Sequence, residues 1–351
     1  MKNVFSSDKI KSFFFKISVV TLLLTLMLLQ SGCQIPYLVE SAWTHLKIMS
    51  SKKDIEKALL SPDISEEWKS KLRLTLEIRP YIKSLGLEIT KNYQTFVDLK
   101  KPFISHLLIV APEYSLKPKT WWFPIIGSFP YKGFHNQQKA LRASENYSKK
   151  KFDIYIRGVS AYSTLGWFND PLLSTMMNFP DEDLVETIIH ESVHATIFIK
   201  NNVDFNEQLA VFIAKKATLN YCREKSIKKY KECLRNYADE DLFTDFLVQS
   251  YDKLDLFYKD KSNHKKSKKK EMFKTIKEFY KTDFLKKFSN RRYDFILDNE
   301  LNNAFFAAQK TYYSNQQKFE SVYKILAKED LKVFISELKK RSSKETTKLF
   351  E

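Results

Sequence analysis

Residues 184–199 read L-V-E-T-I-I-H-E-S-V-H-A-T-I-F-I, a pattern typical of one continuous helix. Residues 181–183 are all acidic and supply the negative charge that favours a helix start. His190 and His194 are four residues apart, so they lie on one helical face. With Glu191 they form H-E-x-x-H, in which both imidazoles bind one Zn²⁺ and the glutamate is the general base. The pattern predicts a zinc hydrolase, and a buried helix with hydrogen-bonded histidines is the alternative.

A catalytic zinc site needs a third protein ligand. Lys200 stands six residues after His194, where the longer H-E-x-x-H-x-x-G-x-x-H pattern has its third histidine, so that arrangement is excluded. Residues 204–210 open a second helical pattern after a short polar turn. An antiparallel helix pair would return Glu207 toward the histidines, which makes Glu207 the predicted third ligand and Asp204 the reserve. The alternative role of Glu207 is to form a capping box with Asp204.

The H-E-x-x-H pattern followed by Asn-Glu resembles the glutamate-ligand zinc peptidases, which include thermolysin and the zinc aminopeptidases. More narrowly, the chain resembles a bacterial family of predicted aminopeptidase lipoproteins. The segments that carry this resemblance are Cys33-Gln34, residues 123–127, 131–133, 158–176 and 190–207, Asn302–Ala304 and Tyr312-Tyr313. The resemblance implies a peptidase that holds one zinc ion per chain. Large zinc aminopeptidases bind the free amine of the substrate through a G-x-M-E-N segment, which this chain lacks. The residues themselves therefore indicate a zinc peptidase, and aminopeptidase activity is implied by the family resemblance alone.

Hydrophobic periodicity predicts a predominantly helical α+β fold. Two amphipathic helices are expected at residues 36–60 and 65–96, and two strands at residues 105–110 and 152–157. A further helix is expected at residues 135–149, and residues 208–345 should be almost entirely helical. Glycine is scarce, at 6 of 351 residues, as in helix-rich chains. We expect a zincin-like site on an antiparallel helix pair that is bordered by a small β-sheet.

The predicted domain is residues 33–351, with its zinc helices at about 182–217 and a helical C-terminal region at about 218–351.

Substrate contacts are predicted in the segment from Tyr162 to Asp170. In zincins an edge strand binds the peptide backbone, and this segment offers backbone groups and apolar contacts. Tyr162, Asn169 and Asp170 are the predicted substrate-binding residues, and Asn169 or Asp170 would receive a substrate amine. A turn packed by aromatic residues is the alternative. Tyr312 and Tyr313, in a patch shared with the resembling family, are candidate donors to the oxyanion.

The N-terminus has the pattern of an export signal. Lysines precede an apolar run at residues 17–29, which is too short to span a membrane comfortably. The run ends in Gln-Ser-Gly-Cys33, which resembles a bacterial lipobox, so residues 1–32 are the predicted signal peptide and Cys33 carries the lipid. The protein is then anchored in the bacterial cell envelope, and Gln34 favours the outer membrane, facing the periplasm, if the host has two membranes. An uncleaved signal anchor or an ordinary secretory signal is the alternative.

Two further cysteines, Cys222 and Cys233, form an even pair once Cys33 carries lipid. In an oxidising envelope a disulfide between them is predicted, and two free thiols are the alternative. The formal net charge of +17 is spread along the chain and rests mostly on lysine. Its densest cluster, residues 259–270, reads as a solvated loop. No nucleic-acid partner is expected, and attraction to anionic lipid headgroups is the expected effect of the charge.

Three functions are consistent with these residues. The first is a lipid-anchored zinc aminopeptidase that acts on peptides, and the second is a zinc endopeptidase of the envelope. They share the metal chemistry and differ in whether the free amino terminus of the substrate is bound. The third is a zinc-bearing scaffold lipoprotein without turnover.

Overall fold

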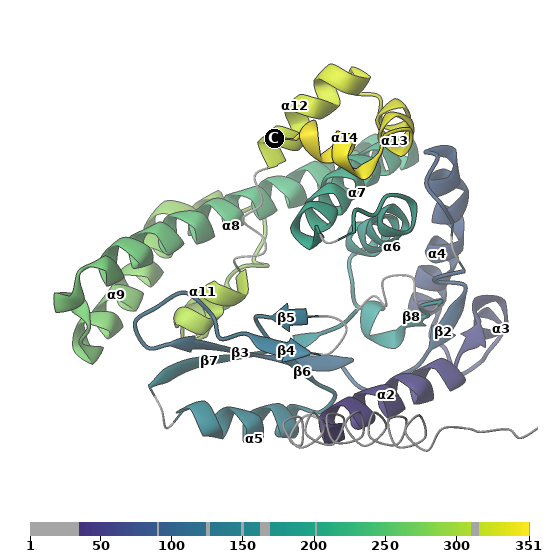
Figure 1. Ribbon diagram of the computed structural model, residues 1–351. Coiled ribbons are helices and arrows are strands. Elements are labelled where there is room, and N and C mark those ends of the chain that lie inside the picture. Colours follow the sequence, from purple (N-terminus) through teal and green to yellow (C-terminus); the bar gives the residue numbers. More distant parts are fainter. Residues whose placement is uncertain are drawn as a thin grey trace, which may run out of the picture. The chain divides into compact units, whose positions relative to one another are not determined.

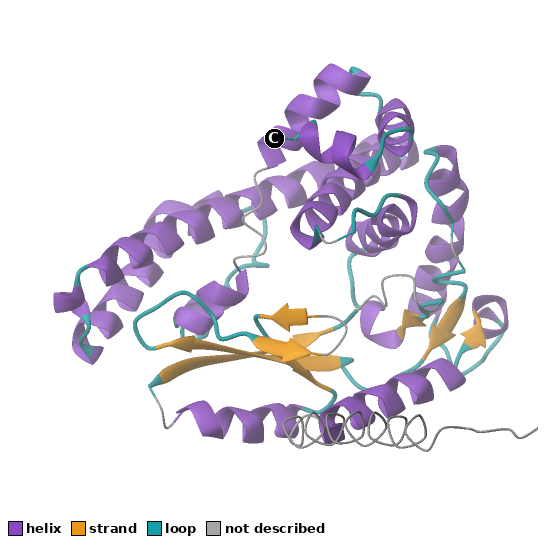
Figure 2. Cartoon of the chain, in the orientation of Figure 1, coloured by secondary structure: helices purple, strands orange, loops and turns teal. Residues whose placement is uncertain are grey.

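The structure is a computed structural model that describes residues 35–89, 91–123, 127–148, 151–161, 169–200, 202–309 and 316–350. Helices predominate in these residues, and small sheets lie among them (Figures 1 and 2). This confirms the prediction of a predominantly helical α+β fold. The chain divides after Ser51 into two units, and the described part of the first is α2 (Ile35–Ser50). Within the described ranges no helix has the length and apolar character that a membrane span requires.

The longest strands of the second unit are β3 (Ser105–Pro112) and β7 (Phe152–Val159). They pair antiparallel over their full length, so that Ser105 faces Val159 and Pro112 faces Phe152. β6 (Lys132–Phe134) pairs antiparallel with the other edge of β3. Both predicted strands are confirmed, and each is two residues longer than predicted.

Two helices cover this sheet. α5 (Gln137–Ser148) and α11 (Asn303–Gln309) pack against β3 and β7, and Figure 1 shows them on opposite faces. Ile109 and Ala111 of β3 are buried against Ala304 and Ala307 of α11, which explains why this stretch of β3 is apolar. The predicted helix at residues 135–149 is confirmed with slightly narrower bounds.

Two other sheets are shorter. β2 (Thr95–Val97) lies between β1 (Lys53–Asp54), which is antiparallel to it, and β8 (Leu172–Leu173), which is parallel. β4 (Trp121–Phe123) pairs antiparallel with β5 (Gly127–Phe129).

The long helix predicted at residues 65–96 is wrong beyond its first part. α4 (Glu66–Ser84) starts where Ser65 accepts a hydrogen bond from the backbone N–H of Trp68. It ends before Gly86, which has a left-handed φ of 81°, a conformation that terminates helices and favours glycine. The helix predicted at residues 36–60 is likewise divided into α2, β1 and α3 (Ile55–Leu59).

The rest of the described chain is mostly helical, as predicted for residues 208–345. Its elements are η1 (Ser174–Met176), α6 (Asp181–Thr196), α7 (Val203–Lys225), α8 (Ile227–Lys259), η2 (Lys261–Asn263), α9 (Lys266–Phe279), the π-helical η3 (Tyr280–Phe284), η4 (Leu285–Lys287), α10 (Phe295–Asp298), α12 (Gln316–Ala327), α13 (Leu331–Lys339) and α14 (Ser343–Lys348). The lysine-rich stretch at residues 259–270, predicted to be a solvated loop, lies largely in these helices. α4 packs on α6, and α8, α12 and α13 pack on α7.

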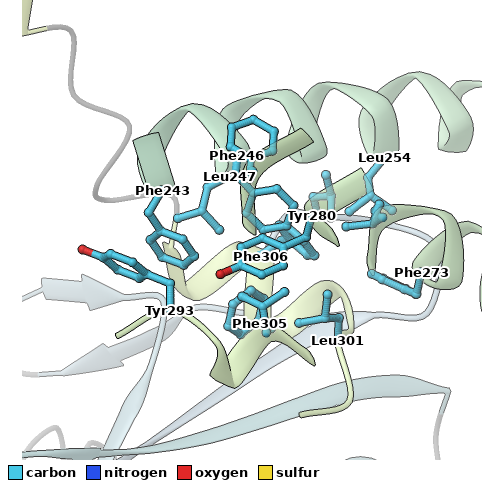
Figure 3. Close-up of a cluster of buried hydrophobic side chains, with 14 residues drawn as sticks. Phe243, Phe246, Leu247, Leu254, Phe273, Tyr280, Tyr293, Leu301, Phe305 and Phe306 are labelled. Atoms are coloured by element: carbon cyan, nitrogen blue, oxygen red, sulfur yellow. The ribbon is translucent and has the colours of Figure 1, made fainter. Parts of the chain in front are cut away.

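An aromatic core joins α8 to the segments that follow it. Figure 3 shows Phe246 of α8 packed with Tyr280, Phe305 and Phe306, and all four side chains are buried. Phe246 and Tyr280 meet edge-on, with ring centroids 5.0 Å apart, as do Phe305 and Phe306 at 5.2 Å. This core fixes α8, which forms one wall of a cavity described below.

The structure joins Cys222 at the end of α7 to Cys233 near the start of α8 by a disulfide. Ser226 stands between the two helices and caps α8 by accepting a hydrogen bond from the backbone N–H of Lys229 at 3.1 Å. A cross-link over so short a loop typically contributes about 2–3 kcal/mol of stability.

A buried ion pair ties the helices to the sheet. Lys269 of α9 is 2.7 Å from both carboxylate oxygens of Asp153 in β7. Asp153 also accepts a hydrogen bond from the backbone N–H of Asn303, and the Asn303 side chain donates to the carbonyl of Pro112 and accepts from Tyr258. The Asn302–Ala304 segment, which is part of the family resemblance, thus includes a residue that links α11 to the β3–β7 pair.

We predict that Lys269→Ala lowers the free energy of unfolding by about 3 kcal/mol or more, because it leaves a largely buried carboxylate without its cation. Urea unfolding followed by circular dichroism measures this. The matched control is Lys270→Ala, an exposed lysine of the same helix, for which a change within about 0.5 kcal/mol is expected. Equal small effects of both substitutions contradict the assignment of the ion pair as an anchor.

Candidate metal centre

The site is built on α6 and α7, which pack against each other. α6 begins directly after Pro180 with three acidic residues in its first turn, and it buries Leu184, Ile188 and Val193. It ends at Thr196, three residues earlier than the apolar pattern suggests, because Ile197 is extended, with φ −133° and ψ 110°. α7 begins at Val203, so the connection is as short as the sequence predicts.

Asn206 closes this connection. Its side-chain oxygen accepts a hydrogen bond from the backbone N–H of Ile199 at 2.9 Å, and its side-chain nitrogen donates to the carbonyl of the same residue at 2.8 Å. Asn206 is 1% exposed, so these are the bonds that satisfy its amide in the interior. The closure fixes where α7 starts and directs Glu207, the next residue, toward α6. Sequence analysis noted Asn206 only as part of the Asn-Glu pattern and missed this role.

The structure brings His190, His194 and Glu207 together. One ligand atom from each residue lies within 4.8 Å of the others. The Nε2 atoms of the two histidines are 3.0 Å apart, and Glu207 places one carboxylate oxygen 3.4 Å from Nε2 of His190 and the other 3.3 Å from Nε2 of His194. Two imidazoles and a carboxylate are a donor set that can hold a metal ion, and it is the one such cluster of three in the described ranges.

The electrostatics of this cluster keep Glu207 ionised. Burial raises the pKa of Glu207, but the hydrogen bonds and charges of His190 and His194 lower it by more than burial raises it, so that the pKa is about 2. Burial lowers the pKa of His194, whereas Glu207 and Glu191 raise it, and the net pKa lies above the usual value. Nδ1 of His194 is buried without a partner among the described residues, so Nε2 is the ring atom engaged in the cluster.

Glu191 lies on the side of α6 next to His194, whose pKa it helps to raise. It lines a small pocket with Arg79 and Tyr93. Tyr93 is buried and has a left-handed φ of 56°, which is uncommon for a side chain of its size. Burial first, and then the charge of Glu191, raises the pKa of Tyr93 well above its usual value. Sequence analysis missed Tyr93, because no local pattern connects it to α6.

Two of the predicted substrate-binding residues, Asn169 and Asp170, differ in exposure. Asp170 is buried; its N–H donates to the side-chain oxygen of Asn92 at 2.9 Å, and its carbonyl accepts from the N–H of Tyr93 at 2.8 Å. Asn169 is exposed, and its carbonyl accepts a hydrogen bond from Lys52. A role of either residue in binding substrate stays a prediction. Asp204 is exposed in the first turn of α7, outside the cluster of three.

Four predicted residues, Cys33, Tyr162, Tyr312 and Tyr313, lie outside the described residues.

A cavity of 580 Å³, here called the His190 cavity, opens beside the cluster. Its wall includes His190 and residues one and two turns earlier on α6, a stretch of α8, and the pair Arg292-Tyr293. Ala161 and Gln309 also line it. Sequence analysis did not predict this cavity, because its walls come from segments far apart in the chain.

The family model described as "Putative aminopeptidase" matches residues 36–349, which include the whole of this site. The chain therefore belongs to that family, and this membership indicates a peptidase. No curated protein and no solved structure matches the chain significantly.

We predict that Asn206→Ala lowers the free energy of unfolding by about 1–3 kcal/mol, because it leaves the backbone N–H of Ile199 buried and unsatisfied. Urea unfolding measures the change. Asn220→Ala is the control, since the Asn220 amide oxygen accepts only an exposed hydrogen bond from Arg223 on the same helix. A loss no larger than that of the control shows that Asn206 does not fix the connection.

Proposed function

We propose that this chain is a zinc-dependent peptidase in which His190, His194 and Glu207 hold one zinc ion and Glu191 is the general base. The observation that carries the proposal is the convergence of three ligand atoms from two helices to within 4.8 Å, in a chain whose family is described as an aminopeptidase.

The spacing of the donor atoms supports zinc. Ligand atoms about 2.05 Å from a tetrahedral zinc ion lie about 3.3 Å from one another. In the cluster the two Nε2 atoms are 3.0 Å apart, and each lies 3.3 or 3.4 Å from a different carboxylate oxygen of Glu207, which is close to this spacing. Its carboxylate is ionised, as a ligand must be. Three protein ligands leave one tetrahedral position for water or substrate, which distinguishes catalytic from structural zinc sites.

When bound at such a site, zinc lowers the pKa of a water molecule and polarises a substrate carbonyl. The protein residues supply the proton transfers and the positioning. Glu191 follows His190 directly on α6, and its charge acts on His194, which supports the proposal that its carboxylate accepts the proton lost by the attacking water. The same carboxyl group then returns the proton to the leaving amine. In this proposal His190 and His194 would hold the metal through Nε2 and take no part in the proton transfers.

We also propose that lipid on Cys33 anchors the protein in the bacterial cell envelope. The lipobox-like sequence supports this. The Cys222–Cys233 disulfide supports an oxidising compartment, where such bonds persist. Outer-membrane attachment facing the periplasm is the form of this proposal for a host with two membranes.

We predict that the full-length protein in detergent holds about one zinc ion per chain, and that His194→Ala and Glu207→Ala each lose it. Elemental analysis after zinc reconstitution measures the content. His264→Ala is the control, because His264 stacks on Tyr114 outside the cluster. Retention of zinc in Glu207→Ala alone moves the third ligand to Asp204 or elsewhere. Absence of zinc from the wild type contradicts the proposal.

We predict that Glu191→Gln keeps its zinc but lowers kcat for peptide hydrolysis by about 10²–10⁴-fold, because an amide cannot accept the proton. Release of nitroaniline from leucine nitroanilide and cleavage of a peptide library measure this. The control is Glu88→Gln, an exposed glutamate distant in sequence from α6.

The same assays separate the remaining functions. Hydrolysis that is lost when the substrate amine is acetylated indicates an aminopeptidase, whereas cleavage of blocked internal bonds indicates an endopeptidase. A zinc-bearing wild type that cleaves nothing favours the scaffold.

A further inference from the structure

The His190 cavity has an acidic wall that continues the metal-ligand face of α6. Asp183, Glu186 and His190 are spaced by three and four residues, so they lie along one face of the helix, and all three line the cavity. Glu182 of α6 and Glu240 of α8 add two more carboxyl groups to its wall.

Three of these four carboxyl groups have evident partners. Arg292 lies 2.7 Å from Asp183, and Lys215 lies 3.1 Å from Glu240. Glu182 accepts a hydrogen bond from the side-chain nitrogen of Asn236 at 2.5 Å. These contacts are structural, because they join α6, α7 and α8 or fix the segment after η4.

Glu186 differs from the others. It accepts a hydrogen bond from the hydroxyl of Tyr237 at 2.5 Å, which is a neutral donor. No lysine or arginine forms an ion pair with Glu186 within the described part of the chain. Burial, with a further contribution from Glu240, raises the pKa of Glu186, whereas the Tyr237 hydroxyl and the charge of Lys215 lower it, and the resulting pKa is about 7. Lys215 forms its ion pairs with Glu240 and Asp241, so a cation that enters the cavity would be the ion-pair partner of Glu186.

We propose that the His190 cavity is the subsite that receives an ammonium group of the substrate, and that Glu186 is the carboxylate that binds it. This inference rests on the proposed peptidase function, and it supplies the amine-binding group that the sequence does not reveal.

The helix geometry suits the α-ammonium group of an amino-terminal residue. Glu186 and His190 are one helical turn apart, which corresponds to a rise of about 6 Å. The nitrogen of an amino-terminal residue is two bonds of about 1.5 Å from its carbonyl carbon. An ion-pair hydrogen bond adds about 2.8 Å. A substrate bound through its ammonium group at Glu186 thus has its first carbonyl beside His190.

The ammonium group of a lysine side chain is the second source of the same chemistry. The cavity also has aromatic walls, in which Phe243 and Tyr293 stack with centroids 4.2 Å apart. Leu247 adds apolar surface. Such walls suit the aliphatic stem of a lysine as well as the side chain of a neutral first residue.

Binding of small amides by calorimetry tests the proposal. Glu191→Gln serves as the background so that no ligand is cleaved, and the full-length protein is used in detergent with and without zinc. Alanine amide carries an α-ammonium group, N-acetyl-lysine amide carries only a side-chain ammonium group, and N-acetyl-alanine amide carries neither.

We expect Glu186→Gln to weaken binding of at least one ammonium ligand about 10- to 100-fold and to leave the uncharged ligand unchanged. Glu186→Asp keeps the charge and should restore part of the affinity. Glu271→Gln, an exposed glutamate of α9 outside the cavity wall, should change nothing. A loss confined to alanine amide assigns the subsite to the substrate's amino terminus, and a loss confined to N-acetyl-lysine amide assigns it to a lysine side chain.

Two outcomes overturn the proposal: equal affinity of the Glu186→Gln variant and its parent for both ammonium ligands, or a loss that instead follows Asp170→Asn. Failure of the proposed peptidase function can be distinguished from failure of this inference. In that case the wild type lacks zinc or hydrolyses no peptide, while ammonium binding still depends on Glu186. Thermal unfolding of each variant shows that lost binding is not lost folding.

Discussion

The hydrogen bonds between the Asn206 side chain and the backbone of Ile199 are the constraint on which the proposed metal centre depends. Two imidazoles and a carboxylate converge only if the chain reverses within a few residues and α7 then starts in one particular register. A longer or looser connection would let Glu207 slide along α6 or turn away from it. Because the Asn206 amide is buried and bonds to both polar groups of one residue, the reversal has a single low-energy form.

Two largely buried carboxylates elsewhere in the molecule have several protein partners, unlike those on this face of α6. Asp239 accepts hydrogen bonds from the backbone N–H and hydroxyl of Ser289 and from the side chain of Asn290, and Asp153 pairs with Lys269. These carboxylates are satisfied by the protein itself and hold α8 and the sheet in place. Among the described residues, Glu186 accepts a hydrogen bond from a neutral hydroxyl and forms no ion pair, although the charge of Lys215 acts on it, and Glu207 pairs with the two histidines. The carboxylates with the weakest partners thus lie where the proposed metal ion and cationic substrate would bind.

The features predicted from sequence are those set by short spacings. H-E-x-x-H, the nearby Glu207 and the strands at β3 and β7 each follow from periodicity within one or two elements. The helix predicted at residues 65–96 failed because Gly86 ends α4 and residues Thr95–Val97 pair as a strand with segments distant in sequence. Glu186 was missed for a similar reason: its partner Tyr237 is 51 residues away, and only the packing of α8 beside α6 forms the cavity.

One helix face therefore carries three kinds of site in order. At its start Asp183 pairs with Arg292, one turn later Glu186 faces the cavity, and the last two turns present His190 and His194. The rise of an α-helix, about 1.5 Å per residue, fixes the distance from the proposed ammonium site at Glu186 to the proposed metal ligands independently of any loop. A substrate with more than one residue on the amino-terminal side of the cleaved bond would have to place its amine away from Glu186 or bind in uncharged form. If Glu186 binds the substrate's ammonium group as proposed, the spacing along α6 favours removal of single amino-terminal residues over internal cleavage.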